Sequence, residues 1–335
     1  PIFRGHRGFG LSLGQPSMLG LGGRKTNQMK FIKLFTVFIV LMPMWGNAQK
    51  KLPVFDVQGH RGARGLRPEN TIPAFIMALD SGVTTVELDL AVTKDKKLVV
   101  SHEPYMSANI CLGPDGGPIA KKEEKTYNIH EMTYEQVKGF DCGSMGNEDF
   151  PEQEKMKVAK PLLEDVIVAV EDHIKSYTRY EVDYNIEIKS SPDGDNKFHP
   201  GPKEFSDLVY ALVDQYLPLE RIVIQSFDFR VLRYWHETYP QVRLAALVEN
   251  RKSVEANLEA LGFDPAIYSP YYRLLTRQKV DLLHQRNIKV VPWTVNEISS
   301  MLALKGMGVD GFITDYPNRA KRFANTLNIV PRDRK

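Results

Sequence analysis

The chain has 335 residues, of which 42% are hydrophobic, and it carries 44 basic and 41 acidic side chains. Six of the basic residues and none of the acidic ones fall in residues 1–48. The remaining 335 − 48 = 287 residues therefore hold 44 − 6 = 38 basic against 41 acidic groups, a net charge of −3. This balance does not indicate the basic surface that binds nucleic acid, so we expect no nucleic-acid partner.

The first 48 residues have the features of segments that do not belong to the folded domain. Met29 opens a stretch with two lysines, an apolar run over 34–42 and small residues up to Ala48. This pattern predicts a signal peptide at 29–48, cleaved near Ala48, and hence an exported, periplasmic or secreted protein. A retained membrane anchor would need about 20 apolar residues, whereas this run is interrupted by Pro43 well short of that length. No later segment is apolar enough to cross a bilayer. Residues 1–28 precede Met29, and we interpret them as a mistranslated leader.

From residue 53 onward, short β-type runs alternate with amphipathic stretches, which is typical of repeated βα units around a parallel sheet. The link between the strands at 85–92 and 98–101 is too short for a crossover helix, so these two should form an antiparallel hairpin. We predict a distorted TIM (β/α)8 barrel over 53–325, followed by a C-terminal tail at 326–335. Strands are expected at 54–59, 85–92, 98–101, 184–188, 222–225, 244–248, 266–268, 289–293 and 311–314. Helices are expected at 71–79, 162–174, 204–215, 229–238, 254–261, 276–285 and 298–305.

The regular alternation stops over about 104–160, where only 132–140 has a helical pattern. We interpret this segment as an insertion of loops and short helix after the third strand. It would lie over one end of the barrel, where long loops act as lids or specificity elements. Cys111 and Cys142 both fall in it, and a disulfide between them and two unpaired thiols both remain open, because spacing alone does not show that their Cα atoms approach.

Charged side chains follow the predicted strands at the ends where the active sites of such barrels gather. His60 and Arg61 come after the first strand, Glu87 and Asp89 lie on the second, and His102 follows the third. Two histidines can act as general acid and base, and an arginine fork can bind phosphate oxygens. This set predicts chemistry on a phosphate ester.

A carboxylate cluster is expected at the same end of the barrel. Residues two apart on a strand point to one face, so Glu87 and Asp89 should meet Glu187 of the fourth strand there. Three carboxylates in one place need a cation, and oxygen ligands without cysteine favour one divalent ion, Ca²⁺ or Mg²⁺, over zinc. The sequence does not choose between these two ions. Glu187 and Lys189 could alternatively be an ordinary ion pair on a strand.

These motifs resemble those of the glycerophosphodiester phosphodiesterases, a family of the phosphatidylinositol-phospholipase-C-like barrel superfamily. The resemblance covers residues 57–322, and its motifs are HRGARG at 60–65, PENT at 68–71, VELDLAVTKDKKLVVSHE at 86–103, KPLLEDV at 160–166, NIEIKS at 185–190, VIQSFD at 223–228, VPWTVN at 291–296 and GVDGFITDYP at 308–317. One departure is visible, because the family usually has His-Asp where this chain has His102 and Glu103.

The resemblance implies a role for each matching residue. His60 and His102 would be the acid-base pair, and Glu87, Asp89 and Glu187 would bind the metal. Arg61 and Lys189 would contact the phosphate, and Trp293 would pack against the glycerol or leaving-group side. Glu69 would brace the turn at 60–61, and Glu103 would be a second supporting residue, whose longer side chain could change what the acid at this position orients. Trp293 could equally be structural packing. Gln225 is a further candidate for substrate binding, although together with Ser226 it could simply cap the next helix.

The implied reaction is metal-dependent hydrolysis of a small-molecule glycerophosphodiester to sn-glycerol 3-phosphate and an alcohol. A glycerol hydroxyl would attack phosphorus to give a cyclic phosphate, which water would then open. Which histidine is the first base stays open, as do the head group and the oligomeric state. Two alternatives are a phospholipase acting on intact phospholipid or sphingolipid on the same barrel, and a non-catalytic phosphate- or glycan-binding barrel. The first should show an exposed apolar rim, and the second would not need an acid-base pair.

Overall fold

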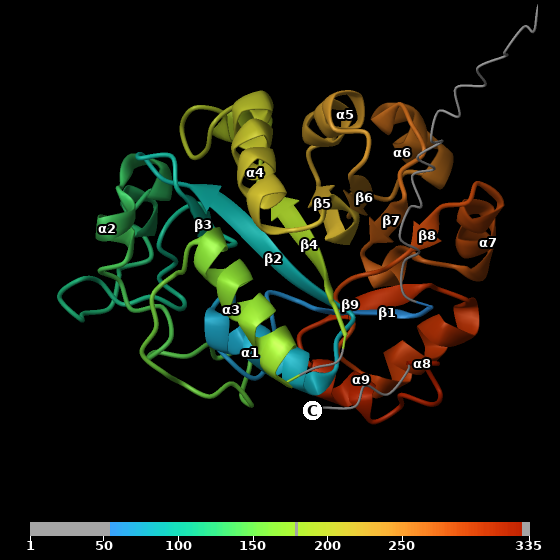
Figure 1. Ribbon diagram of the computed structural model, residues 1–335, viewed down its shortest axis with the longest axis horizontal. Helices are drawn as coiled ribbons and strands as arrows, with labels where there is room; N and C mark the ends of the chain where they lie inside the picture. Colours follow the sequence, from blue (N-terminus) through green and yellow to red (C-terminus); the bar gives the residue numbers. More distant parts are fainter. Residues whose placement is uncertain (1–53, 178–179, 330–335) are drawn as a thin grey trace, which may run out of the picture. The chain divides into compact units, whose positions relative to one another are not determined.

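The computed structural model describes residues 54–177 and 180–329, in which eight parallel strands and their helices form a nearly closed barrel (Figure 1). The expected leader at 1–28 and signal peptide at 29–48 lie outside the described residues. Neighbouring strands follow the order β8, β7, β6, β5, β4, β2, β1, β9. Their bounds are β1 Asp56–Gly59, β2 Thr85–Val92, β4 Asp183–Ile188, β5 Ile222–Ser226, β6 Arg243–Val248, β7 Ile267–Pro270, β8 Lys289–Val290 and β9 Gly311–Thr314. The predicted TIM-barrel class is confirmed.

Strand β8 is shorter than the predicted strand at 289–293, and the reason lies in Pro292. A proline has no N–H to donate to a ladder, so regular pairing stops before it. The chain nevertheless bridges β7 and β9, because Trp293 N donates to Pro270 O at 3.1 Å and Ile313 N donates to Pro292 O at 2.9 Å. Two further bonds, from Asp310 N to Val290 O and from Val295 N to Ile313 O, both at 2.9 Å, also join this part of the chain to β9 and nearly complete the barrel.

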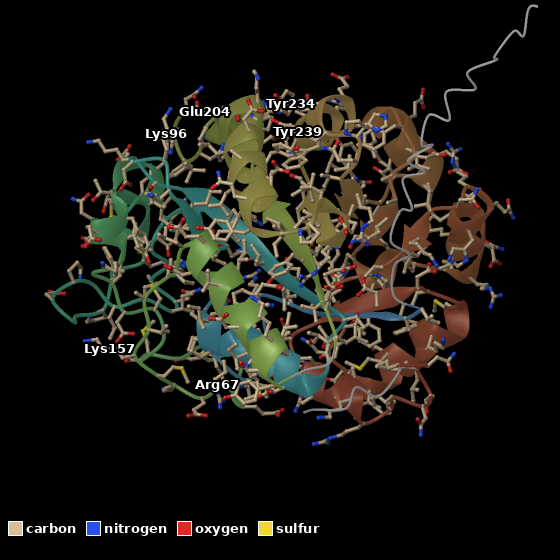
Figure 2. The ribbon with its side chains drawn as sticks, viewed as in Figure 1. Arg67, Lys96, Lys157, Glu204, Tyr234 and Tyr239 are labelled. Carbon is tan, nitrogen blue, oxygen red and sulfur yellow. A yellow bond between two sulfur atoms is a disulfide. The ribbon has the colours of Figure 1, made fainter. Side chains whose placement is uncertain are left out.

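The predicted hairpin is also present. Strand β3, Leu98–Val100, pairs antiparallel with β2, with Leu90 opposite Val100 and Val92 opposite Leu98. At the hairpin turn, Lys96 Nζ lies 2.8 Å from Glu204 Oε1, and both residues lie at the edge shown in Figure 2. The hairpin directs the chain back along β2, where Ser101 N donates to Asp89 O at 2.9 Å, so His102 follows β3 beside the middle of β2.

The residues of β2 show how one strand serves both the core and the site. Val86, Leu88 and Leu90 are fully buried in the main hydrophobic core, while Glu87 and Asp89 alternate with them. Because successive side chains of a strand point to opposite faces, the two carboxylates face the barrel interior as predicted. The local pattern of apolar and acidic residues therefore builds the wall and supplies the chemistry.

The helices cover the outside of the barrel, and α1 illustrates their local signals. Thr71 caps its N-terminus by accepting a hydrogen bond from Ala74 N, and Gly82 ends it with φ 84°. Around the barrel follow α1 Ile72–Ser81, α3 Leu163–Tyr177, α4 Pro202–Tyr216, α5 Phe229–Thr238, α6 Val254–Leu261, α7 Arg277–Gln285, α8 Ile298–Met307 and α9 Pro317–Lys321. Helices α4 and α5 are joined at the surface, where the hydroxyls of Tyr234 and Tyr239 donate to Asp207 Oδ1 at 2.7 and 2.8 Å (Figure 2).

The insertion after β3 has a core of its own. The helical pattern at 132–140 gives only one short helix, α2 Tyr134–Val137, and the 3-10 turns Glu124–Thr126 and Ile129–Glu131 precede it. Met106, Ile129, Val137 and Phe140 are buried together with Cys111 and Cys142, which form a disulfide. A structural disulfide in a segment with little regular structure restricts its unfolded state and so stabilises it.

The segment after α9 is packed against the barrel. Leu327 and Ile329, in the expected C-terminal tail, are buried in the main core, while 330–335 lie outside the described residues. In the part of the chain that the structure describes, none of the helices has the length and apolar character needed to cross a bilayer.

Candidate active site

The eleven predicted site residues come together at the C-terminal ends of the strands, around a cavity of about 160 Å³. Seven of them line the cavity, namely His60, Arg61, Glu87, His102, Glu187, Gln225 and Trp293. The other four touch members of this set: Glu69 and Asp89 contact Arg61, Glu103 contacts His102, and Lys189 contacts Glu187. One compact site therefore collects residues from six strands, β1 to β5 and β8, and the loops after them.

A sharp turn after β1 positions His60 and Arg61. Arg61 has φ 51° and Gly62 has φ 82°, and a Cβ on Gly62 would lie 2.6 Å from the backbone of Ala74. Only glycine fits there without strain. Gly62 N donates to the carbonyls of Gly59 and Glu87, and Arg61 N donates to Glu87 Oε2 at 2.7 Å. The turn is thereby fixed to β2.

His60 is held by a carboxylate that lies 255 residues later in the sequence. Its Nδ1 lies 2.6 Å from Asp315 Oδ1, in the loop after β9. Burial lowers the pKa of His60 to about 4, assisted by the nearby Arg64 charge and opposed by Asp315. His60 is therefore neutral near pH 7. Because Asp315 can only accept, Nδ1 carries the proton and Nε2 keeps a lone pair, which is the arrangement of a general base.

Asp315 is itself fixed by two further residues. Arg64 donates through Nε to Oδ1 at 2.9 Å and through a terminal nitrogen to Oδ2 at 3.2 Å, and Asn296 Nδ2 donates to Oδ2 at 2.7 Å. Burial opposes ionisation of Asp315, but His60 and Arg64 hold its pKa below the usual range. The pair of residues His60 and Asp315 is thus a fixed, oriented unit.

His102 has a different pair of neighbours. Its Nδ1 lies 2.8 Å from Glu103 Oε1, and its Nε2 lies 3.1 Å from Lys189 Nζ. The hydrogen bond to His102, which has more effect than burial, lowers the pKa of Glu103 to about 2. The longer glutamate, at the position where the family usually has aspartate, therefore still reaches the imidazole of its neighbour.

Arg61 is buried between two carboxylates. It donates to Glu69 Oε1 at 2.9 Å, and its Nε lies 3.5 Å from Asp89 Oδ2. Burial alone would lower the pKa of Arg61, but these carboxylates raise it, so that the guanidinium stays charged. Burial likewise works against the Glu69 carboxylate, whose pKa Arg61 and Arg64 nevertheless bring down to about 2. Glu69 therefore braces the arginine as an anion.

Glu87, Asp89 and Glu187 form a cluster in which one oxygen from each lies within 4.8 Å of the others. All three side chains are buried, and burial raises the pKa of Glu87 well above its usual value, with the Asp89 charge adding to the effect. Burial also raises the pKa of Glu187, although Lys189 opposes it. Three buried carboxylate oxygens are the donor set that a hard divalent cation prefers, so the residues present fit such an ion.

The surrounding residues orient these carboxylates. Gln225 Nε2 donates to Glu87 Oε1 at 2.8 Å, and Asn70 Nδ2 donates to Asp89 Oδ2 at 2.8 Å. The amide oxygen of Gln225 accepts from Asn185 Nδ2 at 2.8 Å, so both ends of its amide are engaged. In addition to facing the cavity, Gln225 therefore braces Glu87.

Trp293 closes one wall of the cavity together with Phe227. Their rings meet edge to face at 5.5 Å, and Trp293 Nε1 donates to Ser269 O at 2.9 Å. Phe227 remains 42% exposed. The cavity is thus polar on the histidine side and aromatic on the other.

Asp315, Arg64 and Asn70 were missed as site residues, although each lies in a motif. Asp315 directly follows the last strand, in GFITDYP, and its position at the C-terminal end of a barrel strand is the signal that could have identified it. Arg64 and Asn70 fall in HRGARG and PENT, next to chosen residues. Their contacts depend on how the loop after β1 folds back, which no local pattern gives.

Comparison with known proteins identifies the family of the chain. Residues 60–319 match the model of the Glycerophosphoryl diester phosphodiesterase family. A glycerophosphodiester phosphodiesterase of Bacillus altitudinis is 30% identical over 276 residues, covering 80% of this chain and 97% of that protein. A lysophospholipase D of Rattus norvegicus is 25% identical, covering 80% and 86%. The crystal structure of a putative glycerophosphoryl diester phosphodiesterase from Silicibacter pomeroyi superposes with a TM-score of 0.72 at 27% identity, covering 82% and 93%. The chain therefore belongs to the glycerophosphoryl diester phosphodiesterase family and is a phosphodiesterase.

Proposed function

We propose that this enzyme hydrolyses water-soluble glycerophosphodiesters to sn-glycerol 3-phosphate and an alcohol, with His60 and His102 as the acid-base pair and one divalent cation, Ca²⁺ or Mg²⁺, held by Glu87, Asp89 and Glu187. The observation that carries the proposal is that both imidazoles and two of these three carboxylates line a single cavity of about 160 Å³. A site that only bound phosphate would need no oriented acid-base pair, which disfavours a non-catalytic barrel.

In the first step, His60 Nε2 takes the proton of the glycerol 2-hydroxyl as that oxygen attacks phosphorus. The bond from phosphorus to the departing alcohol breaks, and His102 gives that alcohol a proton. The product held in the site is a cyclic glycerol phosphate. We assign His60 as the first base because Asp315 holds its Nδ1 proton and burial keeps the ring neutral near pH 7.

In the second step the roles reverse, as microscopic reversibility requires. His102 removes a proton from water, which attacks phosphorus and opens the ring, and protonated His60 returns a proton to the 2-oxygen. Each histidine ends in its starting state. Arg61, which lines the cavity, and Lys189 would offset the negative charge of the phosphoryl oxygens, while Glu69 keeps Arg61 in place. A cation bound by the three carboxylates would supply further neutralisation of that charge.

The test uses the purified mature chain and a panel of glycerophosphodiesters, with release of sn-glycerol 3-phosphate as the readout. Activity should disappear with chelator and return when Ca²⁺ or Mg²⁺ is added back separately. His60→Ala and His102→Ala should each lose about a thousandfold or more in kcat. Failure of the wild-type enzyme on every diester, with or without metal, would refute the proposal.

Cleavage of lysophospholipids is a second candidate function. It is favoured by the relative from Rattus norvegicus and by exposed Phe227 beside Trp293, which offers apolar surface at the cavity. A single exposed ring is a small surface for an acyl chain, so soluble diesters remain the preferred substrates. Parallel assays with a glycerophosphodiester and the corresponding lysophospholipid would rank the two.

We also propose that the enzyme works outside the cytoplasm, after cleavage near Ala48. The support is the pattern at 29–48, together with the disulfide between Cys111 and Cys142, which persists in oxidising compartments. Cell fractionation of a full-length, tagged chain tests it, and recovery of uncleaved protein in the cytoplasm would contradict it.

A further inference from the structure

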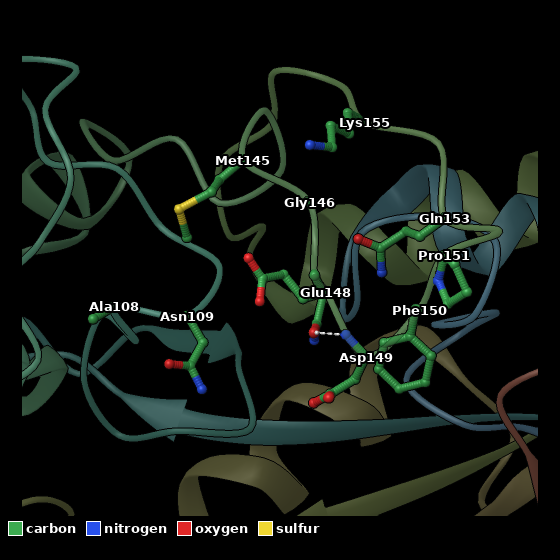
Figure 3. Close-up of a pocket in the computed structure, with 11 residues that line it drawn as sticks. Ala108, Asn109, Met145, Gly146, Glu148, Asp149, Phe150, Pro151, Gln153 and Lys155 are labelled. Atoms are coloured by element: carbon green, nitrogen blue, oxygen red, sulfur yellow. Dashed lines mark hydrogen bonds between the residues drawn. The ribbon is translucent and has the colours of Figure 1, made fainter.

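The insertion is attached to the loop after β1 by a short segment, 150–154. Gln153 Nε2 donates to the carbonyl oxygen of Arg64 at 2.7 Å, and the Arg64 guanidinium lies 4.6 Å from the centre of the Phe150 ring. Glu154 adds a backbone hydrogen bond to Leu66 O at 3.0 Å. Figure 3 shows that Phe150 and Gln153 also lie on the wall of a cavity of about 730 Å³ within the insertion.

Further ion pairs fasten the same segment on both sides. Glu154 Oε2 lies 2.7 Å from a terminal nitrogen of Arg67, and Glu152 Oε1 lies 2.7 Å from one of Arg319. Figure 2 shows Arg67 beside the loops of the insertion. Arg319 belongs to α9, so the segment spans the loop after β1 and the helix after β9. His60 comes from the same loop after β1, and Asp315 lies just before α9, in the loop after β9.

The contacts of Arg64 connect this segment to the acid-base pair. Its guanidinium binds both oxygens of Asp315, and Asp315 Oδ1 accepts the His60 Nδ1 proton. The aromatic face of Phe150 lies against the same guanidinium. An arginine whose guanidinium binds a carboxylate and also lies over an aromatic ring has little freedom to rotate.

We infer that Phe150 and Gln153 of the insertion are positioning residues for the base His60. They act through Arg64 and Asp315, and this role presupposes the phosphodiesterase reaction proposed above. Neither side chain needs to touch substrate. The insertion would then tune catalysis from behind the loop after β1, in addition to any contact with the head group.

The test compares Phe150→Leu, which removes the ring but stays apolar, with Phe150→Tyr, which keeps it. We expect kcat/KM for a soluble glycerophosphodiester to fall roughly fivefold in Phe150→Leu and to recover in Phe150→Tyr. The change should lie mainly in kcat, because the substrate contacts are untouched. Gln153→Met, which removes the donor to the Arg64 carbonyl, provides a second variant, and its kcat/KM should also fall.

The pH profile separates positioning from general loss of structure. The charged groups that act on His60 are Arg64 and Arg61 from the loop after β1 and Asp315 from the loop after β9. If Arg64 is held less firmly, its positive charge can move away from His60 and lowers the pKa of the imidazole less. The acidic limb of kcat/KM, where His60 becomes protonated, should therefore move to higher pH by roughly half a unit. A purely structural defect would lower the whole profile without moving this limb.

Phe140→Leu is the matched control. Phe140 is 4% exposed in the core of the same insertion, where its ring meets Tyr127 edge to face at 5.2 Å. It should lower the unfolding temperature and leave the acidic limb in place. The inference is overturned if Phe150→Leu and Gln153→Met keep the wild-type profile, or if Phe140→Leu shifts the limb equally. An inactive wild-type enzyme would instead refute the proposed function, so the two failures are distinguishable.

Discussion

Replacing Asp315 with asparagine should disable His60 without changing the shape of the site. The carboxylate accepts from His60 Nδ1 at 2.6 Å and from Arg64 at 2.9 and 3.2 Å. An amide can instead donate to Nδ1, which would place the histidine proton on Nε2, the atom that must accept from substrate. We expect kcat/KM to fall about a thousandfold or more, by analogy with carboxylates that orient a catalytic histidine.

The substitution should also change stability and the pH profile. Arg64, whose side chain is 17% exposed, would lose the nearer of its two carboxylate partners and keep only Glu69 Oε2 at 3.7 Å, which should lower the free energy of unfolding by about 1–3 kcal/mol. Because Asp315 raises the pKa of His60, its loss should lower that pKa and move the acidic limb to lower pH. Steady-state kinetics from pH 4 to 9 and urea denaturation measure the two effects.

Asp310→Asn provides the control at the other end of β9. Asp310 directly precedes β9 and also contacts a histidine, with Oδ2 2.8 Å from His284 Nε2. It is at the opposite end of the barrel from the cavity, so it should leave kcat/KM within about twofold of wild type. If Asp315→Asn kept more than a tenth of the wild-type kcat/KM, the assignment of His60 as an oriented base would be wrong.

Three further predictions concern the metal, the turn and the pH dependence of stability. Glu87→Gln should weaken binding of Ca²⁺ or Mg²⁺, measured by calorimetry, by at least about tenfold, because it removes a charged ligand, and unchanged affinity would exclude Glu87 as a ligand. Gly62→Ala should lower the free energy of unfolding by more than about 2 kcal/mol, since it meets both φ 82° and a 2.6 Å contact with Ala74. The pKa of His60 is about 4 when folded and near 6.5 when unfolded, so the unfolded chain binds the extra proton between these values and stability falls as pH drops through this window, by up to about 3 kcal/mol. Denaturation of wild type and His60→Gln at pH 4.5 and 7 isolates this contribution, and an equal acid loss in both would contradict it.

The sequence predicted the parts of this structure that local patterns encode. Alternation along β2 places Glu87 and Asp89 on the inner face, and the short link after Val92 dictates the hairpin. One error was also local, because Pro292 ends regular pairing and the strand predicted at 289–293 is only Lys289–Val290. The disulfide between Cys111 and Cys142 was left open because nothing in a spacing of 31 residues reports distance in space.

Residues that meet across the barrel could not be found in this way. His60 and Asp315 are separated by 255 residues and become neighbours because β9 pairs with β1, with Gly59 opposite Thr314. That register follows from closing the sheet on itself, which no segment specifies alone. Arg64 was overlooked for a related reason, because its role in the site is to bind Asp315, and its own motif does not indicate this contact.

Closure of the barrel therefore has a chemical consequence as well as a structural one. The loop after β1 supplies His60 and Arg64, the loop after β9 supplies Asp315, and the insertion holds Arg64 from outside. Loosening Arg64 and removing Asp315 should move the acidic limb in opposite directions, because one change weakens a positive charge and the other removes a negative charge beside the same imidazole. A general loss of packing could not produce two shifts of opposite sign, so this pair of variants tests whether the three segments act on His60 as one charged unit.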